Sequence, residues 1–217
     1  METSQSLPVL SAEEQRVLGS LMEKSKTTPE YYPLTLNSLV TACNQKSSRK
    51  PVVGYDEGTV VTALDSLKKK GLISTVTGGA SRAVKYKHNF AIVYPVIPAE
   101  IAVICLLLLR GPLTPGEINS NSGRLFEFES LEEVQEILEK LSFSDPKYII
   151  QVPKRAGQKE IRYTHLLGGT PDFDSTEFAE ETNISNKSDI ENRLSKVETE
   201  LAELKEAFEK LMKELMG

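Results

Sequence analysis

The sequence lacks tryptophan, has only two cysteines and two histidines, and contains no apolar run long enough to cross a membrane. The longest apolar run, Ile101–Leu109, is far shorter than the roughly 20 residues that span a bilayer, so we expect a buried helix there and no membrane contact. Cys43 and Cys105 lie in apolar helical patterns, which predicts two buried free thiols. No basic segment followed by an apolar one opens the chain, and the expected location is therefore the cytoplasm.

Motifs of common catalytic and cofactor-binding sites are also missing. The sequence has no GxxxxGK[ST] loop, no GxSxG, no HExxH and no CxxC. His88 and His165 end two similar segments, which favours structural roles over metal binding or general base catalysis. The adjacent acids Asp56–Glu57 and Glu13–Glu14 begin predicted helices, where the helix dipole favours negative charge. We therefore predict a protein that is not an enzyme, with no catalytic residue, no metal site and no cofactor.

Charge is unevenly distributed along the chain, although its net value is only −5. Residues 1–97 carry 12 Lys/Arg and 8 Asp/Glu, residues 98–167 carry 8 and 10, and residues 168–217 carry 6 and 13. A mildly basic first part is thus followed by a mildly acidic second part and a strongly acidic C-terminal part.

The main feature that the sequence does contain is an internal repeat. In residues 59–88, apolar side chains recur at spacings of three and four up to Gly71, and two strand-like segments then flank a glycine-rich turn. Residues 131–165 repeat this order with the helical stripe Val134, Ile137, Leu138 and Leu141. Val84–His88 aligns with Ile161–His165 as an apolar residue, a base, a tyrosine, a variable residue and a histidine. A helix followed by a hairpin is the second half of a winged helix-turn-helix, so the repeat predicts two such domains in tandem.

Helix-start signals define the remaining elements. Ser11 and Glu14 form a capping box that opens a first helix, and Thr114 and Ser130 are expected to cap the second and third helices of the second domain. A second helix is expected over residues 34–44, and strands over 72–76, 83–86, 148–152 and 161–164. The fold class is therefore expected to be mainly α with small β-hairpins (α+β), with winged-helix domains at residues 8–92 and 93–168.

The C-terminal part has a different character. Residues 169–187 are acidic and rich in small residues, which predicts a flexible linker. Residues 188–217 have apolar positions at alternating spacings of four and three, the heptad pattern of a coiled-coil helix. These positions are Ile190, Leu194, Val197, Leu201, Leu204, Phe208, Leu211 and Leu215. We predict self-association through this helix into a homo-oligomer such as a dimer; the alternative is that the helix packs back onto its own winged helices.

Two unusual segments, ACNQKSSRKPV at Ala42–Val52 and LLLRGPLTPGEI at Leu107–Ile118, resemble the bacterial YceH-like proteins, a family of unknown function. The resemblance covers residues 8–168. It implies a tandem winged-helix architecture and no particular activity. The helix after Thr114 is basic in that family, whereas this chain has the uncharged residues Ile118–Ser122 there. This difference argues against a nucleic-acid role for the second domain.

Two functions remain open from the sequence, and the first is binding of double-stranded DNA. The third helix of the first domain would enter the major groove while the wing touches the backbone. Candidate contact residues are Lys46, Arg49, Lys50, Thr59, Thr62, Lys69, Arg82 and Lys85. Asp56, Glu57 and Asp65 oppose this function, because they place negative charge where base readout would begin. DNA binding is favoured only because it is the commonest use of the fold, which is an analogy.

The second function is that of a protein–protein interaction adaptor, which uses winged helices without binding nucleic acid. The overall acidity and the predicted coiled coil favour it. So does the third helix of the second domain, which carries the acidic residues Glu132, Glu133, Glu136 and Glu139.

Overall fold

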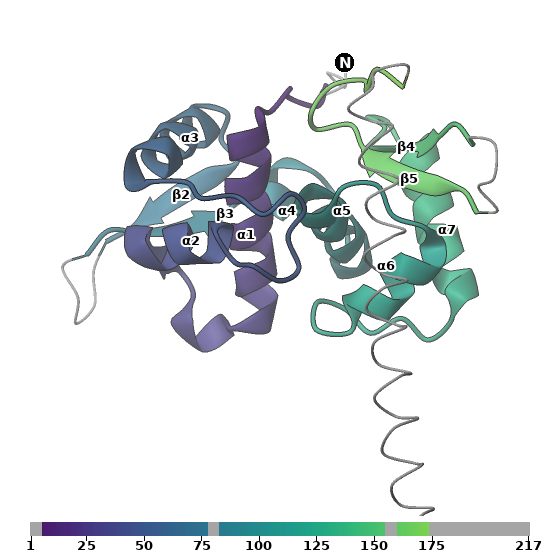
Figure 1. Ribbon diagram of the computed structural model, residues 1–217, viewed down its shortest axis with the longest axis horizontal. Helices are drawn as coiled ribbons and strands as arrows, with labels where there is room; N and C mark the ends of the chain where they lie inside the picture. The colour runs from purple at the N-terminus through teal and green to yellow at the C-terminus, as the bar shows by residue number, and fades with distance from the viewer. Residues whose placement is uncertain (1–5, 78–82, 155–159, 174–217) are drawn as a thin grey trace, which may run out of the picture. The chain divides into compact units, whose positions relative to one another are not determined.

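A computed structural model describes residues 6–77, 83–154 and 160–173 of the chain (Figure 1). The chain divides into two compact units, residues 1–171 and 172–217, and of the second unit only Asp172 and Phe173 are described. The predicted coiled-coil positions from Ile190 to Leu215 therefore lie outside the described residues, as does most of the linker predicted at 169–187.

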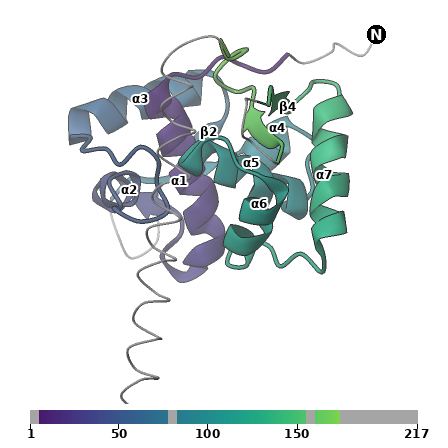
Figure 2. The ribbon, with the colours of Figure 1, turned by 45° about the vertical axis from the view of Figure 1, so that its right-hand side comes forward.

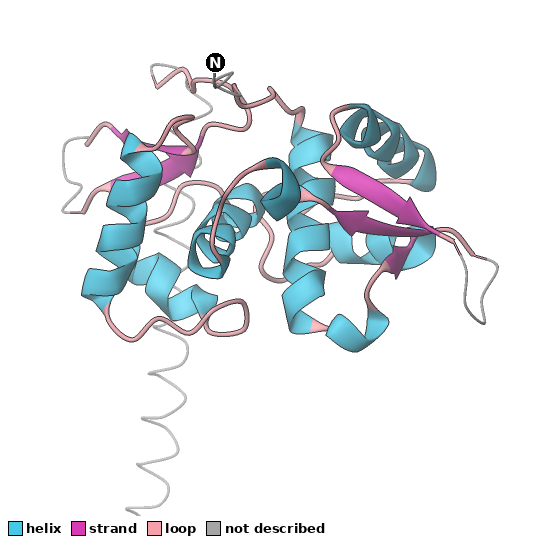
Figure 3. Cartoon of the chain, turned by 180° about the vertical axis from the view of Figure 1, so that it is seen from behind, coloured by secondary structure: helices cyan, strands magenta, loops and turns pink. Residues whose placement is uncertain are grey.

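The N-terminal half of the first unit, residues 12–88, contains three α-helices and a small antiparallel sheet (Figure 1). Its elements are α1 (Ala12–Thr27), the 3-10 helix η1 (Pro29–Tyr31), β1 (Leu34–Thr35), α2 (Leu36–Cys43), α3 (Glu57–Lys69), β2 (Ile73–Val76) and β3 (Lys85–His88). The strand order is β1–β3–β2, and Figure 3 draws these strands in magenta. Leu34 lies opposite Tyr86, and Ile73 lies opposite His88.

The C-terminal half, residues 98–165, repeats this order after the short helix α4 (Phe90–Val93). Its elements are α5 (Pro98–Arg110), α6 (Pro115–Ser122), α7 (Leu131–Phe143), β4 (Ile149–Val152) and β5 (Arg162–His165), and Figure 2 brings α6 and α7 forward. An isolated antiparallel bridge joins Leu113 to Tyr163 where the first half has β1, and Ile149 lies opposite His165. The two halves therefore share both element order and strand register.

Side-chain caps start the helices where the sequence predicts them. The Ser11 hydroxyl accepts a hydrogen bond from the backbone N–H of Glu14 at 3.3 Å, and the Glu14 carboxylate accepts from the Ser11 N–H at 2.7 Å. Thr114 and Glu117 form the same reciprocal pair at 3.2 and 2.8 Å. Ser130 caps α7 by accepting from the N–H three residues further on at 3.2 Å. Each cap satisfies a backbone donor that the helix itself cannot pair.

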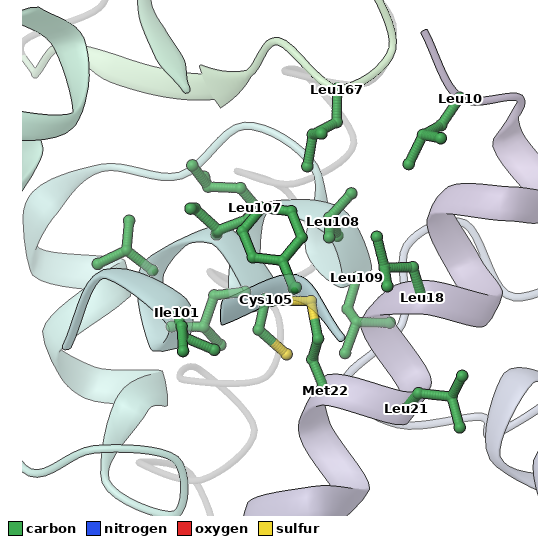
Figure 4. Packing of buried hydrophobic residues seen from close by; sticks show 14 of the residues in the cluster. Leu10, Leu18, Leu21, Met22, Ile101, Cys105, Leu107, Leu108, Leu109 and Leu167 are labelled. Atoms are coloured by element: carbon green, nitrogen blue, oxygen red, sulfur yellow. The ribbon is translucent and has the colours of Figure 1, made fainter. Parts of the chain in front are cut away.

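One apolar core runs through both halves, and the crossing of α1 and α5 lies at its centre (Figure 4). Every residue of α5 from Ala99 to Leu109 is buried, as expected for this apolar segment. Gly19 of α1 permits the close approach of the two helices, because a Cβ at this position would lie 2.9 Å from Leu109 Cδ2. The Cys105 thiol fills the crossing and donates to the Gly19 carbonyl at 3.4 Å.

Further contacts join the halves around this crossing. The Leu10 N–H donates to the Leu167 carbonyl at 2.7 Å, and the Lys50 N–H donates to the Leu109 carbonyl at 2.8 Å. An aromatic cluster, with ring centroids 5.1, 5.9 and 6.4 Å apart, packs next to α4 and consists of Phe90, Tyr94 and Tyr148. Such edge-to-face and tilted pairs add to the stabilisation that burial alone provides.

The expected α+β class, mostly helical with small antiparallel sheets, is confirmed, and Cys43 and Cys105 are buried free thiols as predicted. Several boundaries differ from the prediction by one or two residues. Leu34 and Thr35 form a strand, and the helix expected from residue 34 begins at Leu36, because Thr35 caps it. The strand expected over 83–86 lies at 85–88. Within the described ranges, no helix combines the length and the apolar character needed to cross a bilayer.

Candidate interaction surfaces

The surface predicted to bind DNA consists of α3, the loop before it and the strands β2 and β3; we call it the first face. Of the predicted contact residues, the exposed ones are Lys46, Thr62 and Lys69, and the half-buried ones are Lys50, Thr59 and Lys85. Arg82 lies outside the described residues. The same elements carry two further lysines: Lys68 is exposed on α3, and Lys87 is half-buried on β3.

Arg49 differs from the prediction, because its side chain is fully buried. Its Nη1 and Nη2 atoms donate to the two carboxylate oxygens of Glu23 at 2.9 and 2.6 Å, and Nε and Nη2 donate to the Ala42 carbonyl at 3.1 and 2.9 Å. Burial is the largest single influence on Glu23 and opposes its ionisation, but the hydrogen bonds and positive charge of Arg49, together with those of Lys24, outweigh burial and keep the pKa of Glu23 below its ordinary value. Arg49 therefore fixes the loop onto α1 and α2, and its guanidinium does not face a ligand on the surface.

Acidic residues border the N-terminal part of α3. A shallow pocket of about 550 Å³ lies between the start of α1 and the first turns of α3, and Glu13, Asp56, Thr59 and Thr62 are among the residues that line it. Asp56 caps α3 by accepting from the Thr59 N–H at 2.7 Å, and this hydrogen bond lowers the pKa of Asp56. Two of the predicted DNA contacts, Thr59 and Thr62, therefore lie beside carboxylates, and the positive charge of α3 itself is confined to its C-terminal end, at Lys68 and Lys69.

A larger groove, which we call the α7 groove, lies on the corresponding side of the C-terminal half. Its volume is about 850 Å³, and it is bounded by α7, the start of α6 and the hairpin β4–β5. Its lining includes Leu131, Gln135, Glu139, Phe143, Lys147, Ile149, Ile150, Lys154, Glu160, Ile161 and Tyr163. Phe143 is 77% exposed and Leu131 is 39% exposed at the two ends of α7. Large apolar side chains are unusual at such exposed positions when they are gathered around one concavity.

The repeat allows the two faces to be compared position by position. The buried residues Val60, Leu64 and Leu67 of α3 correspond to Val134, Leu138 and Leu141 of α7, and both helices have 13 residues. In this alignment Glu57 corresponds to Leu131, and Lys69 to Phe143. The strand register places Ser74 of β2 in correspondence with Ile150 of β4. At these three positions a polar or charged residue of the first face is replaced by an apolar residue in the α7 groove.

Charge also distinguishes the two faces. Glu132, Glu136 and Glu139 are exposed along α7, and the neighbouring Lys140 is paired with the buried Glu100 at 2.7 Å. Arg162 of β5 corresponds to Lys85 of β3, but it is buried and forms a bidentate pair with Glu117 at 2.8 and 2.9 Å. The C-terminal half thus engages two of its cations in ion pairs, of which that of Arg162 is buried and that of Lys140 lies at the surface, while three acids of α7 remain exposed.

The two histidines occupy equivalent strand ends in the sheets. The Nε2 atom of His88 lies 3.2 Å from the Ser25 hydroxyl, and the Nδ1 atoms of His88 and His165 are buried without a hydrogen-bond partner in the described part of the chain. Burial lowers the pKa of each imidazole to about 4, so both are neutral near pH 7. The described residues contain no group of three or more His, Cys, Asp or Glu side chains that could hold a metal ion.

Known sequences place the chain in a family. The family described as "Protein of unknown function, DUF480" matches residues 10–158. The chain belongs to this family. Similar family members include a UPF0502 protein of Opitutus terrae, 52% identical over 81% of this chain and 76% of its own length, and one of Shewanella sp. (strain ANA-3), 42% identical over 95% and 99%. The UPF0502 protein YceH of Escherichia fergusonii is 43% identical over 95% of this chain and 97% of its own length, which confirms the resemblance noted from the sequence.

Sequence reasoning missed the α7 groove, although a signal for it was present. Phe143 lies outside the stripe of buried positions in its helix, and in the other copy of the repeat its position is occupied by Lys69. A large apolar residue at a position where its duplicate is charged indicates that the two faces have different environments.

Proposed function

We propose that this chain is a tandem winged-helix protein that acts as a protein-interaction adaptor, with the α7 groove as its docking site. Support for the winged-helix assignment comes from the order helix, helix, helix, hairpin in each half, with β1 or the Leu113 bridge after the first helix, and from the strand order β1–β3–β2 in the first half. The observation that carries the functional proposal is the exposure of Phe143, at 77%, beside an apolar groove. Exposed aromatic side chains beside a pocket are the usual anchors of protein interfaces.

A pull-down with matched variants tests this function. Full-length wild-type chain and Phe143→Lys, which introduces on α7 the residue type that α3 has, are compared under identical conditions, with Lys46→Glu as a control on the first face. We expect at least one partner that the wild type and Lys46→Glu enrich equally and that Phe143→Lys loses. Identical partner sets for all three proteins would contradict the proposal.

A second candidate function is DNA binding by the first face, and the observation that favours it is a group of lysines. Lys68 and Lys69 are exposed at the C-terminal end of α3, Lys85 and Lys87 alternate along β3, and Lys46 is exposed in the loop before α3. Lysines at such positions suit phosphate contacts, which provide affinity without sequence choice. Because carboxylates border the start of α3, this candidate predicts backbone contacts and little base readout.

Fluorescence-anisotropy titration of random duplex DNA at two salt concentrations tests this candidate. If Lys68 and Lys69 each contact a phosphate, Lys68→Glu/Lys69→Glu should weaken binding at least about 10-fold and reduce the slope of log K against log salt by about 2. Equal binding by the wild type and the variant would exclude this face. Substitution of Arg49 is unsuitable for this purpose, because it would remove the partner of the partly buried Glu23.

A further inference from the structure

We propose that the segment which docks in the α7 groove combines a large apolar side chain with lysine or arginine residues, so that the partner is a basic, amphipathic protein segment. This inference rests on the proposed adaptor function and specifies its partner. The size, the apolar lining and the charge of the groove each contribute to it.

The volume and the lining of the groove determine the apolar part of the partner. A space of about 850 Å³ is within the range of pockets that bind drug-sized ligands, so it has room for a bulky side chain. Ile149 is buried at its base, Ile150 and Ile161 are half-buried, and Phe143 and Leu131 stand exposed at the two ends of α7. An aromatic or long aliphatic side chain placed there would remove these exposed surfaces from water, which is the main source of affinity at an interface.

The charge of α7 determines the polar part of the partner. Glu132, Glu136 and Glu139 are spaced by four and three residues, so they lie along one side of the helix, and Glu139 itself lines the groove. Lys140, the only cation of α7, is held by Glu100. The remaining charged residues of the lining are the carboxylate of Glu160 and the two lysines Lys147 and Lys154. Along the α7 side, an incoming segment therefore meets three exposed glutamates and a single lysine that is already paired, so the charge of this side is negative.

This arrangement selects against acidic partners. A segment with carboxylates or phosphates placed next to α7 would face the three exposed glutamates, and like charges across an interface reduce both the association rate and the affinity. A segment with lysine or arginine at the same place would gain attraction, which weakens as salt screens it. The apolar lining supplies affinity for many segments, whereas the glutamates decide which of them bind.

Selection from a peptide library against the full-length chain tests the inference. The probe is a displayed library of random 16-residue peptides, selected at low salt and sequenced before and after enrichment. We expect enriched peptides with a positive net charge and at least one aromatic or long aliphatic residue. An enriched peptide, synthesised with a fluorophore, should bind at least 10-fold more weakly to Phe143→Lys and to Glu136→Lys/Glu139→Lys, and equally to the first-face control Lys68→Glu/Lys69→Glu.

The possible outcomes separate the inference from the function on which it rests. If the wild type, shown to be folded by circular dichroism, enriches no peptide family, or if Phe143→Lys binds the peptide as the wild type does, the docking function itself fails. If peptides are enriched without basic residues, or if Glu136→Lys/Glu139→Lys binds them unchanged, the docking site stands and the basic partner is wrong. The remaining alternative is that a second copy of this chain occupies the groove, and sedimentation equilibrium of the wild type and of Phe143→Lys tests it. Self-association that Phe143→Lys abolishes would assign the groove to this second copy and overturn the proposal.

Discussion

The two halves of the first unit have similar internal contacts and different exposed faces. In each half a glutamate in the first turn of the first helix forms an ion pair with a lysine in or just after the third helix: Glu14 pairs with Lys70, which follows α3, and Glu100 pairs with Lys140 of α7. The matching register of Leu34 with Tyr86 and of Leu113 with Tyr163 extends this likeness to the sheets. Interior positions of a duplicated fold can change little, because each one must satisfy packing and hydrogen bonding at the same time.

The outer faces carry no such constraint, and there the halves have diverged. The end of α3 has Lys69 where α7 has Phe143, and the start of α3 has Glu57 where α7 has Leu131. A charged side chain at an exposed position changes the free energy of folding little, and an exposed phenylalanine side chain does not contribute to the stability of the fold. We therefore assign the difference to function. The four predictions that follow test the likeness of the interiors and the divergence of the surfaces, in order of decreasing effect.

The largest effect is expected where each half holds a buried arginine. Removal of the partner carboxylate by Glu23→Ala in the first half or Glu117→Ala in the second leaves a buried guanidinium without its counter-charge. Each substitution should lower the free energy of unfolding by about 3 kcal/mol or more. The exposed control Glu136→Ala should change it by less than about 0.5 kcal/mol. Urea denaturation measures these differences, and a neutral result for Glu23→Ala would contradict the structural role assigned to Arg49.

The next effect is a loss of stability in mild acid, shared by both halves. The folded pKa of His88 and of His165 is about 4, below the ordinary value of 6.5, so the unfolded chain binds more protons between these values. Stability is therefore fully present above pH 6.5 and falls as the pH drops towards 4, by about 1–2 kcal/mol per histidine between pH 7 and pH 5.

Denaturation curves over this pH range measure the effect. His88→Gln and His165→Gln should each reduce the pH dependence of the free energy of unfolding by a similar amount, because the two sites are equivalent. The carboxylates with lowered pKa values, such as Glu14 and Glu23, lose their contribution only below their ordinary value of 4.5 and so do not confuse the measurement. An unchanged slope in both variants would show that the imidazoles are not the titrating groups.

A smaller effect is expected at the crossing that joins the halves. Gly19→Ala would place a methyl group 2.9 Å from Leu109 Cδ2 and 3.2 Å from Leu108 Cβ, and the two helices must separate slightly to accept it. We expect a loss of about 1–2 kcal/mol in thermal or urea denaturation. Gly123→Ala is the matched control, because its Cβ would meet nothing within 4 Å and its φ of −52° suits alanine. Equal stability of the two variants would mean that α1 and α5 are less closely packed than described.

The smallest effect on folding is expected at the residue with the largest proposed role in binding. Phe143→Lys should change the free energy of unfolding by less than about 0.5 kcal/mol, because the side chain is 77% exposed and contributes little to the core. Differential scanning calorimetry at neutral pH measures this. A loss of 2 kcal/mol or more, a threshold typical of buried apolar side chains, would identify Phe143 as a structural residue and weaken the comparison.

Much of the fold follows from local sequence patterns, because local interactions determine it. The stripe Val60, Leu64 and Leu67 predicts the buried side of α3, and Ser11 with Glu14 predicts the start of α1. Boundaries were less predictable where two local tendencies compete. Thr35 can extend a strand or cap a helix, and its pairing with Lys85 across the sheet makes it do both.

The candidate surfaces were less predictable, because they depend on residues that are distant in sequence. Arg49 stands in a basic loop with Lys46, and nothing local distinguishes the two. The loop runs next to α1, and there the Arg49 side chain binds Glu23. This tertiary contact removes Arg49 from the surface. Phe143 in turn follows the apolar Leu141 in a helix, and only the tertiary structure reveals that it faces an open groove.

The most direct test of the account is hydrogen–deuterium exchange of the full-length chain, with and without a peptide selected as described above. If the α7 groove is the docking site, the peptide should slow exchange in residues 131–152 and 160–163 and leave residues 57–76 unchanged. The same peptide should give no protection in Phe143→Lys. Protection confined to residues 57–76 would contradict the account, because it would place binding on the lysine-bearing first face and leave the exposed phenylalanine without a role.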